Sequence, residues 1–308
     1  MDELRKDYFL DRYVLISPVR SKRPHLVRHE KKKKDSRCSF CIGNEGKTPQ
    51  ELYRYPHTKE WQLRVFYNKY PVVTPGKNPE MKRKGSLVSS GSFGYHEVIV
   101  DTPGHDEELW DLPIERIADV LRVYNERIEA NMKKRGIKYV SLFKNHGGLA
   151  GASLHHSHSQ LVAYSQIPEI IKEKEKAIAS RDNPYGHLIK GEMDSSRRCF
   201  ENIHFAAFCP FASRFPYEIV VFPKRHILNA TELTEDEIIS LAEIMRIILL
   251  KLRVVGENYN FYFQNGIKNM RFHIEMMQRK GTLAGFELAT DCLINTVRPE
   301  DAAKFYRE

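Results

Sequence analysis

Hydrophobic and polar residues follow one another in the same order twice along this chain. In each copy a short β-branched run comes after a glutamate and leads into a proline and a histidine, at 97–105 and at 218–226. Apolar residues at helical spacing follow, at 114–132 and at 238–252. The pattern therefore predicts two strand–helix pairs. The histidines that end the two strands, His105 and His226, are 121 residues apart.

Two further strands complete each copy. The first of them ends at Asn145 or at Asn265, and a histidine-bearing strand follows at 156–163 or at 271–277. With 308 residues, the chain is long enough for two domains. We therefore predict an α+β fold of two pseudo-symmetric domains, each an antiparallel sheet packed with helices, at residues 1–190 and 191–308.

Capping residues indicate where the two helices begin. Asp111 can cap the first helix, with Pro113 in its first turn, and Gly136 closes it. Thr234 and Glu237 form a capping box for the second helix.

Composition and charge restrict the class of protein. Aromatic residues are plentiful, and no apolar run is long enough to cross a bilayer, so we expect a folded protein without a membrane segment. Much of the net charge of +9 lies in two basic runs, 31–34 and 82–84, which we interpret as solvated loops. Binding of small anionic substrates fits this charge as well as nucleic-acid binding does, and we do not expect nucleic-acid binding to be the main function. Five cysteines, an odd number, and an N-terminus unlike a signal peptide favour the cytoplasm.

The densest chemistry lies at 151–160, where three histidines fall within four residues. In an extended segment His156 and His158 point to one side, and Gln160 is next along that face. A neutral imidazole is a good nucleophile toward phosphorus, and a glutamine amide can stabilise the oxyanion that develops. A surface cluster or an expression tag would be alternatives, but this run is mid-chain and precedes apolar residues. We assign no role to His155, which we expect to face solvent.

The second copy carries only His273-x-Glu275 where the first has His-x-His-x-Gln. Catalysis is therefore predicted in the first copy, while the second supplies shape and substrate contacts.

A pair of cysteines, Cys38 and Cys41, has the spacing of zinc ligands. A redox pair is the alternative, although the sequence lacks the βαβ setting of a thioredoxin motif. Histidines must complete a tetrahedral site, and the candidates are His105 and one histidine of 155–158.

Taken together, these segments resemble the galactose-1-phosphate uridylyltransferase family, within the histidine-triad superfamily. The similarity extends over nearly the whole chain. The matching segments are Arg20-Ser21-Lys22-Arg23-Pro24, Cys38-x-x-Cys41 with Gly43-Asn44-Glu45, Asn68-Lys69-Tyr70-Pro71, His156-Ser157-His158-Ser159-Gln160, Cys209-Pro210-Phe211-Ala212 and Ala284-Gly285-Phe286-Glu287.

The resemblance implies a role for each matching residue. It implies one structural zinc ion on Cys38, Cys41, His105 and His156, in a catalytic histidine-triad-like first domain ahead of a degenerate second one. It implies that His158 is the nucleophile and that Gln160 holds the phosphoryl group. It also implies substrate contacts by Arg20, Arg23, Asn68, Asn145, Ser153 and Glu287.

Three departures from the family pattern affect what can be carried over. Ser157 replaces the proline of the usual His-Pro-His segment. Some members hold a second metal with a His-x-His pair and a glutamate, where this chain has His273-x-Glu275 and Lys174, so a second metal is doubtful. The residues after Glu287 lack the glutamine that true galactose-1-phosphate enzymes use, which leaves the sugar open.

The resemblance implies ping-pong transfer of a nucleotidyl group. His158 would attack a nucleoside diphosphate sugar, release sugar 1-phosphate, and pass the nucleotide to a second sugar phosphate, as in a UDP-glucose–hexose-1-phosphate uridylyltransferase. A phosphorylase or hydrolase of nucleoside diphosphate sugars or dinucleoside polyphosphates, using the same histidine, is the alternative. A nucleotide- or RNA-binding protein without catalysis is the non-enzymatic alternative. We also expect a homodimer.

Overall fold

The computed structural model describes residues 2–22 and 38–308, which pack into two compact units. Unit 1 contains the described parts of Met1–Lys34 together with Asn145–Ser153 and Ile170–Glu308. Unit 2 contains the described part of Asp35–Lys144 together with Leu154–Glu169. No described helix combines the length and the hydropathy that crossing a bilayer would require.

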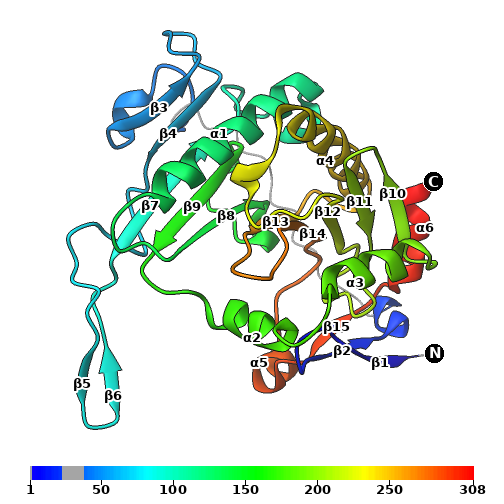
Figure 1. Cartoon of the computed structure of the whole chain (residues 1–308). Coiled ribbons are helices and arrows are strands. Elements are labelled where there is room, and N and C mark those ends of the chain that lie inside the picture. Colours follow the sequence, from blue (N-terminus) through cyan, green and yellow to red (C-terminus); the bar gives the residue numbers. More distant parts are fainter. Residues whose placement is uncertain (1, 23–37) are drawn as a thin grey trace. The chain divides into compact units, whose positions relative to one another are not determined.

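Unit 2 is built on an antiparallel sheet with the strand order β3-β4-β7-β9-β8 (Figure 1). The last two residues of β8 belong to unit 1. The strands are β3 (Glu51–Tyr55), β4 (Leu63–Tyr67), β7 (Gly94–Val100), β9 (His158–Tyr164) and β8 (Tyr139–His146).

Unit 1 contains an antiparallel sheet with the strand order β10-β11-β12-β14-β13. Its strands are β10 (Arg198–Glu201), β11 (Phe205–Phe208), β12 (Ile219–Pro223), β14 (His273–Gln278) and β13 (Tyr259–Gln264). A smaller sheet joins the two ends of the chain, because β1 (Glu3–Lys6) and β2 (Tyr13–Ile16) pair with β15 (Leu293–Asn295).

The predicted duplication is visible in the order of these strands. In unit 2 the last strand of the repeat, β9, lies between β7 and β8, and in unit 1 the last strand, β14, lies between β12 and β13. The registers correspond as well, since Val98 faces Gln160 and Val220 faces Glu275. The α+β class with antiparallel sheets is therefore confirmed, and β14 is the counterpart of β9.

One long helix follows the first strand of each repeat. Helix α1 (Ile114–Met132) buries one apolar stripe, and helix α4 (Glu235–Val255) buries 10 of its 21 residues. The capping box of Thr234 and Glu237 is present at α4, as predicted. Asp111 instead closes a 3₁₀ turn, and Pro113 is the N-cap of α1, one residue before its first turn.

Shorter elements complete the units. They are helices α2 (Glu169–Ile178), α3 (Pro184–Met193), α5 (Gly285–Thr290) and α6 (Pro299–Arg307), and strands β5 (Lys82–Lys84) and β6 (Leu87–Ser89). Strands β5 and β6 form an exposed hairpin of unit 2 (Figure 1), so the basic run at 82–84 is a strand and the loop prediction is wrong. The other basic run, 31–34, lies outside the described residues.

The compact units do not follow the predicted division between residues 190 and 191. The N-terminal strands pair with β15, and Ile170 onward packs with the C-terminal part of the chain. Contacts between residues far apart in the sequence set the boundaries of the compact units, and no local sequence pattern reveals such contacts. The division at residue 190 describes the expected repeat and stays a prediction.

Candidate active site and metal cluster

Alternation along β9 and the two residues before it separates two sets of side chains in unit 2. His156, His158 and Gln160 point to one face, while Ser157 and Ser159 point to the other. His156, Ser157, His158 and Ser159 are all buried. The segment 156–160 therefore presents its side chains to two different environments.

On the first face, Cys38, Cys41, His105 and His156 form a cluster whose ligand atoms all lie within 4.8 Å of one another. The Nδ1 atom of His156 lies 3.7 Å from Cys38 Sγ and 3.6 Å from Cys41 Sγ, and His105 Nδ1 lies 3.3 Å from Cys41 Sγ. Zinc bonds of about 2.3 Å to sulfur and about 2.0 Å to nitrogen place such ligands about 3.5 Å apart in a tetrahedron. The cluster has the dimensions of a site that could hold a metal ion.

A hydrogen bond determines which nitrogen of His156 faces the cysteines. Its Nε2 atom lies 2.8 Å from the carbonyl oxygen of Thr102, which only accepts, so Nε2 carries the proton and Nδ1 presents a lone pair to the cysteines. Burial lowers the pKa of His156 to about 4, which keeps the ring neutral. Burial and the adjacent Cys38 raise the pKa of Cys41 to about 11, so a bound cation would be needed to hold the Cys41 thiol as a thiolate.

A hydrogen bond to a backbone carbonyl oxygen also orients His158, but this bond uses Nδ1 and not Nε2. Its Nδ1 atom donates to the carbonyl oxygen of His156 at 2.8 Å, so in the neutral ring the lone pair is on Nε2. Within the described part of the chain no hydrogen bond or ion pair is formed by that Nε2. Burial lowers the pKa of His158 and favours the neutral ring. Phe40, from the turn between the cysteines, meets the ring edge-on with centroids 5.3 Å apart.

Gln160 is joined by another predicted residue, Asn68, which follows β4. The Asn68 amide nitrogen lies 3.4 Å from Gln160 Oε1, and its own Oδ1 accepts from the backbone N–H of Tyr70 at 2.8 Å. Unit 2 therefore brings together His158, Gln160 and Asn68 beside the metal cluster. His155, to which no role was assigned, lies at the surface with its Nε2 3.3 Å from an Asp106 carboxylate oxygen.

The opposite face of the segment rests on a buried charge network that the sequence did not predict. Lys144, which is fully buried, places its Nζ 2.8 Å from Asp101 Oδ2, 2.8 Å from Ser157 Oγ and 3.0 Å from Glu108 Oε1. Although burial lowers it, the two carboxylates raise the pKa of Lys144 overall. Ser157 donates to Glu108 at 2.6 Å.

This network gives Ser157 a function that a proline could not have. The hydroxyl ties the segment between the two histidines to Lys144 and Glu108, and Lys144 also donates to the backbone carbonyl of His158 at 3.3 Å. The only sequence signal was one charged residue, Lys144, in the strand Tyr139–His146, and its acidic partners Asp101 and Glu108 lie more than 30 residues away.

The remaining predicted residues belong to unit 1. Asn145 Oδ1 accepts from Asn260 Nδ2 at 2.7 Å, and Ser153 is exposed. Arg20 is exposed in a 3₁₀ turn, and Glu287 lies in α5, where its carboxylate accepts from the backbone of Ala284 at 3.1 Å. Arg23 lies outside the described residues.

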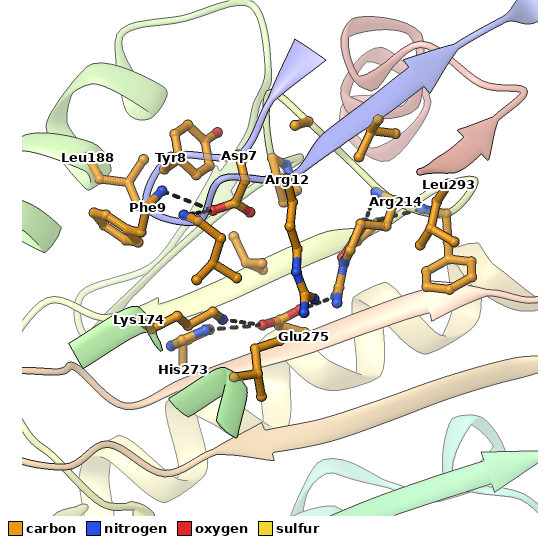
Figure 2. A pocket seen from close by; sticks show the side chains of 18 of the residues that line it. Asp7, Tyr8, Phe9, Arg12, Lys174, Leu188, Arg214, His273, Glu275 and Leu293 are labelled. Carbon is orange, nitrogen blue, oxygen red and sulfur yellow. Dashed lines mark hydrogen bonds and ion pairs between the residues drawn. The ribbon is translucent and has the colours of Figure 1, made fainter. Parts of the chain in front are cut away.

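Unit 1 also encloses a cavity of about 190 Å³ beside β14 (Figure 2). Its wall carries Glu275, whose carboxylate lies 3.4 Å from Lys174 Nζ and 3.3 Å from His273 Nε2 and also accepts from Arg214 and the Tyr262 hydroxyl. Although burial favours the neutral acid, Arg214 and Lys174 hold the pKa of Glu275 well below its usual range. A second divalent cation does not suit this set of side chains, because two side-chain cations already neutralise the carboxylate.

Two families match the chain. The family described as "Galactose-1-phosphate uridyl transferase, N-terminal domain" matches residues 1–168. A domain of unknown function, DUF4921, matches residues 120–305.

Characterised relatives cover the whole chain. An ADP-glucose phosphorylase of Arabidopsis thaliana is 32% identical over 99% of this chain and 92% of its own length. A galactose-1-phosphate uridylyltransferase of Thermotoga maritima is 29% identical over 100% of this chain and 98% of its own length. The crystal structure of an ADP-glucose phosphorylase from Arabidopsis thaliana with bound ADP-glucose superposes with a TM-score of 0.87 at 30% identity, covering 100% of this chain and 99% of the other. The similarity therefore includes both repeats.

Proposed function

Because the chain belongs to the galactose-1-phosphate uridylyltransferase family, we propose that it transfers a nucleotidyl group from a nucleoside diphosphate sugar through a covalent intermediate on His158. One observation carries this proposal: His158 donates from Nδ1 to the carbonyl oxygen of His156, which leaves the Nε2 lone pair without a partner among the described residues. A nucleophile of this kind needs no further base, since its attacking atom bears no proton.

In the first step the Nε2 atom of His158 attacks the α-phosphorus, and a nitrogen–phosphorus bond forms. The bond between the α-phosphorus and the bridging oxygen breaks, and sugar 1-phosphate leaves with that electron pair. In the second step an oxygen of an acceptor phosphate attacks the same phosphorus, and the nitrogen–phosphorus bond breaks. His158 is restored in its neutral form, with the Nδ1 proton in place throughout.

We assign stabilising roles to the neighbouring polar groups. Gln160 would donate from its amide to an oxygen of the α-phosphoryl group, a contribution of about 3 kcal/mol for a well-placed donor. Asn68 would border the nucleotide. Arg20, Asn145 and Ser153 would contact phosphates, and Glu287 would bind sugar hydroxyls, with Arg23 assigned alongside Arg20.

The cation that best fits the cluster of Cys38, Cys41, His105 and His156 is zinc. Two thiolates and two neutral imidazoles are a common tetrahedral donor set for this ion. With four protein ligands the ion would have no open position, so its contribution would be structural. It would hold His156 next to the segment that bears His158, and Phe40 would be packed against both rings.

The proposal is tested by incubating the protein with a panel of UDP-, ADP- and GDP-sugars and measuring its intact mass. We expect one donor to add a single nucleotidyl group in the absence of acceptor. No added mass with any donor would contradict the proposal, and the donor that labels fastest would identify the base.

A second candidate differs only in the acceptor. The similarity to the Arabidopsis thaliana ADP-glucose phosphorylase favours inorganic phosphate, which would release a nucleoside diphosphate from the His158 intermediate. Adding phosphate or a hexose 1-phosphate to the pre-labelled protein separates the two. Release of nucleoside diphosphate by phosphate alone would exclude the uridylyltransferase-like reaction, and release by water alone would indicate a hydrolase.

We also propose that the protein is a homodimer of the cytoplasm. Free cysteines support a reducing compartment, and the exposed apolar residues Met81, Leu87 and Val88 on the β5–β6 hairpin support a contact between copies. Sedimentation equilibrium would test the dimer, since a single species of about 36 kDa would contradict it. The division into repeats at 1–190 and 191–308 remains part of the same proposal.

A further inference from the structure

A histidine that has no assigned role lies directly against Gln160. His96 is buried in β7, two residues from Val98, and Val98 is paired with Gln160 in β9. Residues two apart in a strand share a face, so His96 lies diagonally across from Gln160 on the face that also bears His158. The His96 Nε2 atom is 2.9 Å from Gln160 Oε1.

The proton on His96 can be located from its other contact. The backbone N–H of Val72 donates to His96 Nδ1 at 3.3 Å, so Nδ1 must be the unprotonated nitrogen. The neutral ring then carries its proton on Nε2, which donates to the oxygen of the Gln160 amide. The 3.2 Å approach of the Asn68 amide nitrogen to the same Nε2 is therefore a contact between two donors and not a hydrogen bond.

Asn68 reinforces this arrangement. Its Oδ1 accepts from the Tyr70 N–H at 2.8 Å, so its amide nitrogen is the end that points toward Gln160 Oε1, at 3.4 Å. Two N–H donors, from Asn68 and His96, thus point at the oxygen of one amide. A glutamine amide can rotate by half a turn, and in the flipped orientation its NH2 group would face both donors.

We propose that His96 is a positioning residue that fixes the Gln160 amide with its oxygen toward β7, so that its NH2 group remains free to donate to the phosphoryl group on His158. The inference rests on the proposed function, because it names what holds the group that stabilises the transferred phosphate. Burial lowers the pKa of His96, although the hydrogen bond to Gln160 opposes the shift, so the ring is neutral near pH 7.

Two variants separate this role from a structural one. His96→Leu removes the donor, whereas His96→Gln retains an N–H donor at about the same distance from the backbone. With ADP-glucose and UDP-glucose as donors, we expect His96→Leu to slow nucleotidylation of His158 by on the order of 10-fold to 100-fold, with little change in the concentration that gives half the maximal rate. His96→Gln should recover most of that rate.

A double-mutant cycle tests whether His96 acts through Gln160. Once Gln160→Ala has removed the amide, adding His96→Leu should change the rate by less than about 2-fold. If the two substitutions multiply in full, or if His96→Gln is as slow as His96→Leu, the inference is overturned.

The tautomer can be measured without any activity. Nitrogen-15 chemical shifts of the labelled imidazoles should show His96 protonated at Nε2 and His158 protonated at Nδ1. A proton on His96 Nδ1 would overturn the inference even if His158 is labelled normally. Failure of every donor to label the wild-type protein would instead overturn the proposed function.

Discussion

Strands β9 and β14 occupy equivalent places in two repeats, and their histidines are held alike. His158 donates from Nδ1 to His156 O at 2.8 Å, and His273 donates from Nδ1 to Arg271 O at 2.9 Å. The surroundings of the second nitrogen differ. His273 Nε2 faces the Glu275 carboxylate at 3.3 Å, and the ring stacks on Phe222 with centroids 4.6 Å apart.

Two residues further along each strand, at Gln160 and Glu275, the two repeats differ in charge. Gln160 is neutral and receives N–H donors on its oxygen only, so its NH2 group has no partner within the described residues. Glu275 is ionised and is shared by Arg214, Lys174 and Tyr262. The orientation of the histidine is therefore common to the two repeats, and the repeats differ in the surroundings of its second nitrogen and in the side chain two residues further along.

The largest effect is expected from removing the two histidines in turn. His158→Ala should reduce turnover by on the order of 10⁴-fold, because the attacking atom is lost. The matched variant His273→Ala should reduce it by less than about 10-fold. Initial rates per folded molecule measure both, and equal losses would mean that β14 takes part in the chemistry.

Removal of the metal should affect the first repeat alone. Cys38→Ser should abolish binding of one equivalent of zinc and destabilise the protein by several kcal/mol, because burying these polar groups without a cation is unfavourable. Cys199→Ser, a buried cysteine outside the cluster, is the control and should keep the metal. Elemental analysis and thermal melting provide the readouts. Full zinc content in Cys38→Ser would refute the ligand set.

A smaller difference is expected between Lys144, which is buried, and Lys174, which is partly exposed. Lys144→Met leaves Asp101 and Glu108 buried without a cation and should cost about 3–5 kcal/mol in the free energy of unfolding. Lys174→Met should cost about 1–2 kcal/mol, because Glu275 keeps Arg214. Urea denaturation gives both values. A loss for Lys174→Met as large as that for Lys144→Met would show that the two networks are equally dependent on one lysine.

The smallest effect concerns the start of the repeated helices. Helix α4 has the Thr234–Glu237 capping box and α1 has no side-chain cap. The bond from Arg225 lowers the pKa of Glu237 from 4.5 to about 2, so this carboxylate stabilises the fold above pH 4.5 and the contribution disappears as the pH falls toward 2. Glu237→Gln should cost about 1 kcal/mol at pH 7. Its cost should diminish in acid, and a cost independent of pH would argue against the ion pair.

The sequence contained enough information for the repeat, the family and the residues of the metal cluster. Period and spacing are local properties: the cysteines of the cluster stand at zinc-ligand spacing, and its histidines stand at the ends of predicted strands. The family prediction is confirmed by the matching residues 1–168 and by the relatives that cover the whole chain.

Other features depend on contacts between distant residues. Lys144 lies close to Asp101 and Glu108 because β7 and β8 both pair with β9. The pairing of the N-terminal strands with β15 brings both ends of the described chain into unit 1. His96 directly precedes the repeated run at 97–105, and its relation to Gln160 required the strand register.

We propose that β9, and not its counterpart β14, carries the nucleotide. To test this, the protein is incubated with ADP-glucose or UDP-glucose alone, quenched and digested, and the added mass is located by peptide sequencing. We expect a nucleotidyl group on His158 and an unmodified His273. Modification of His273, or of any residue other than His158, would contradict it.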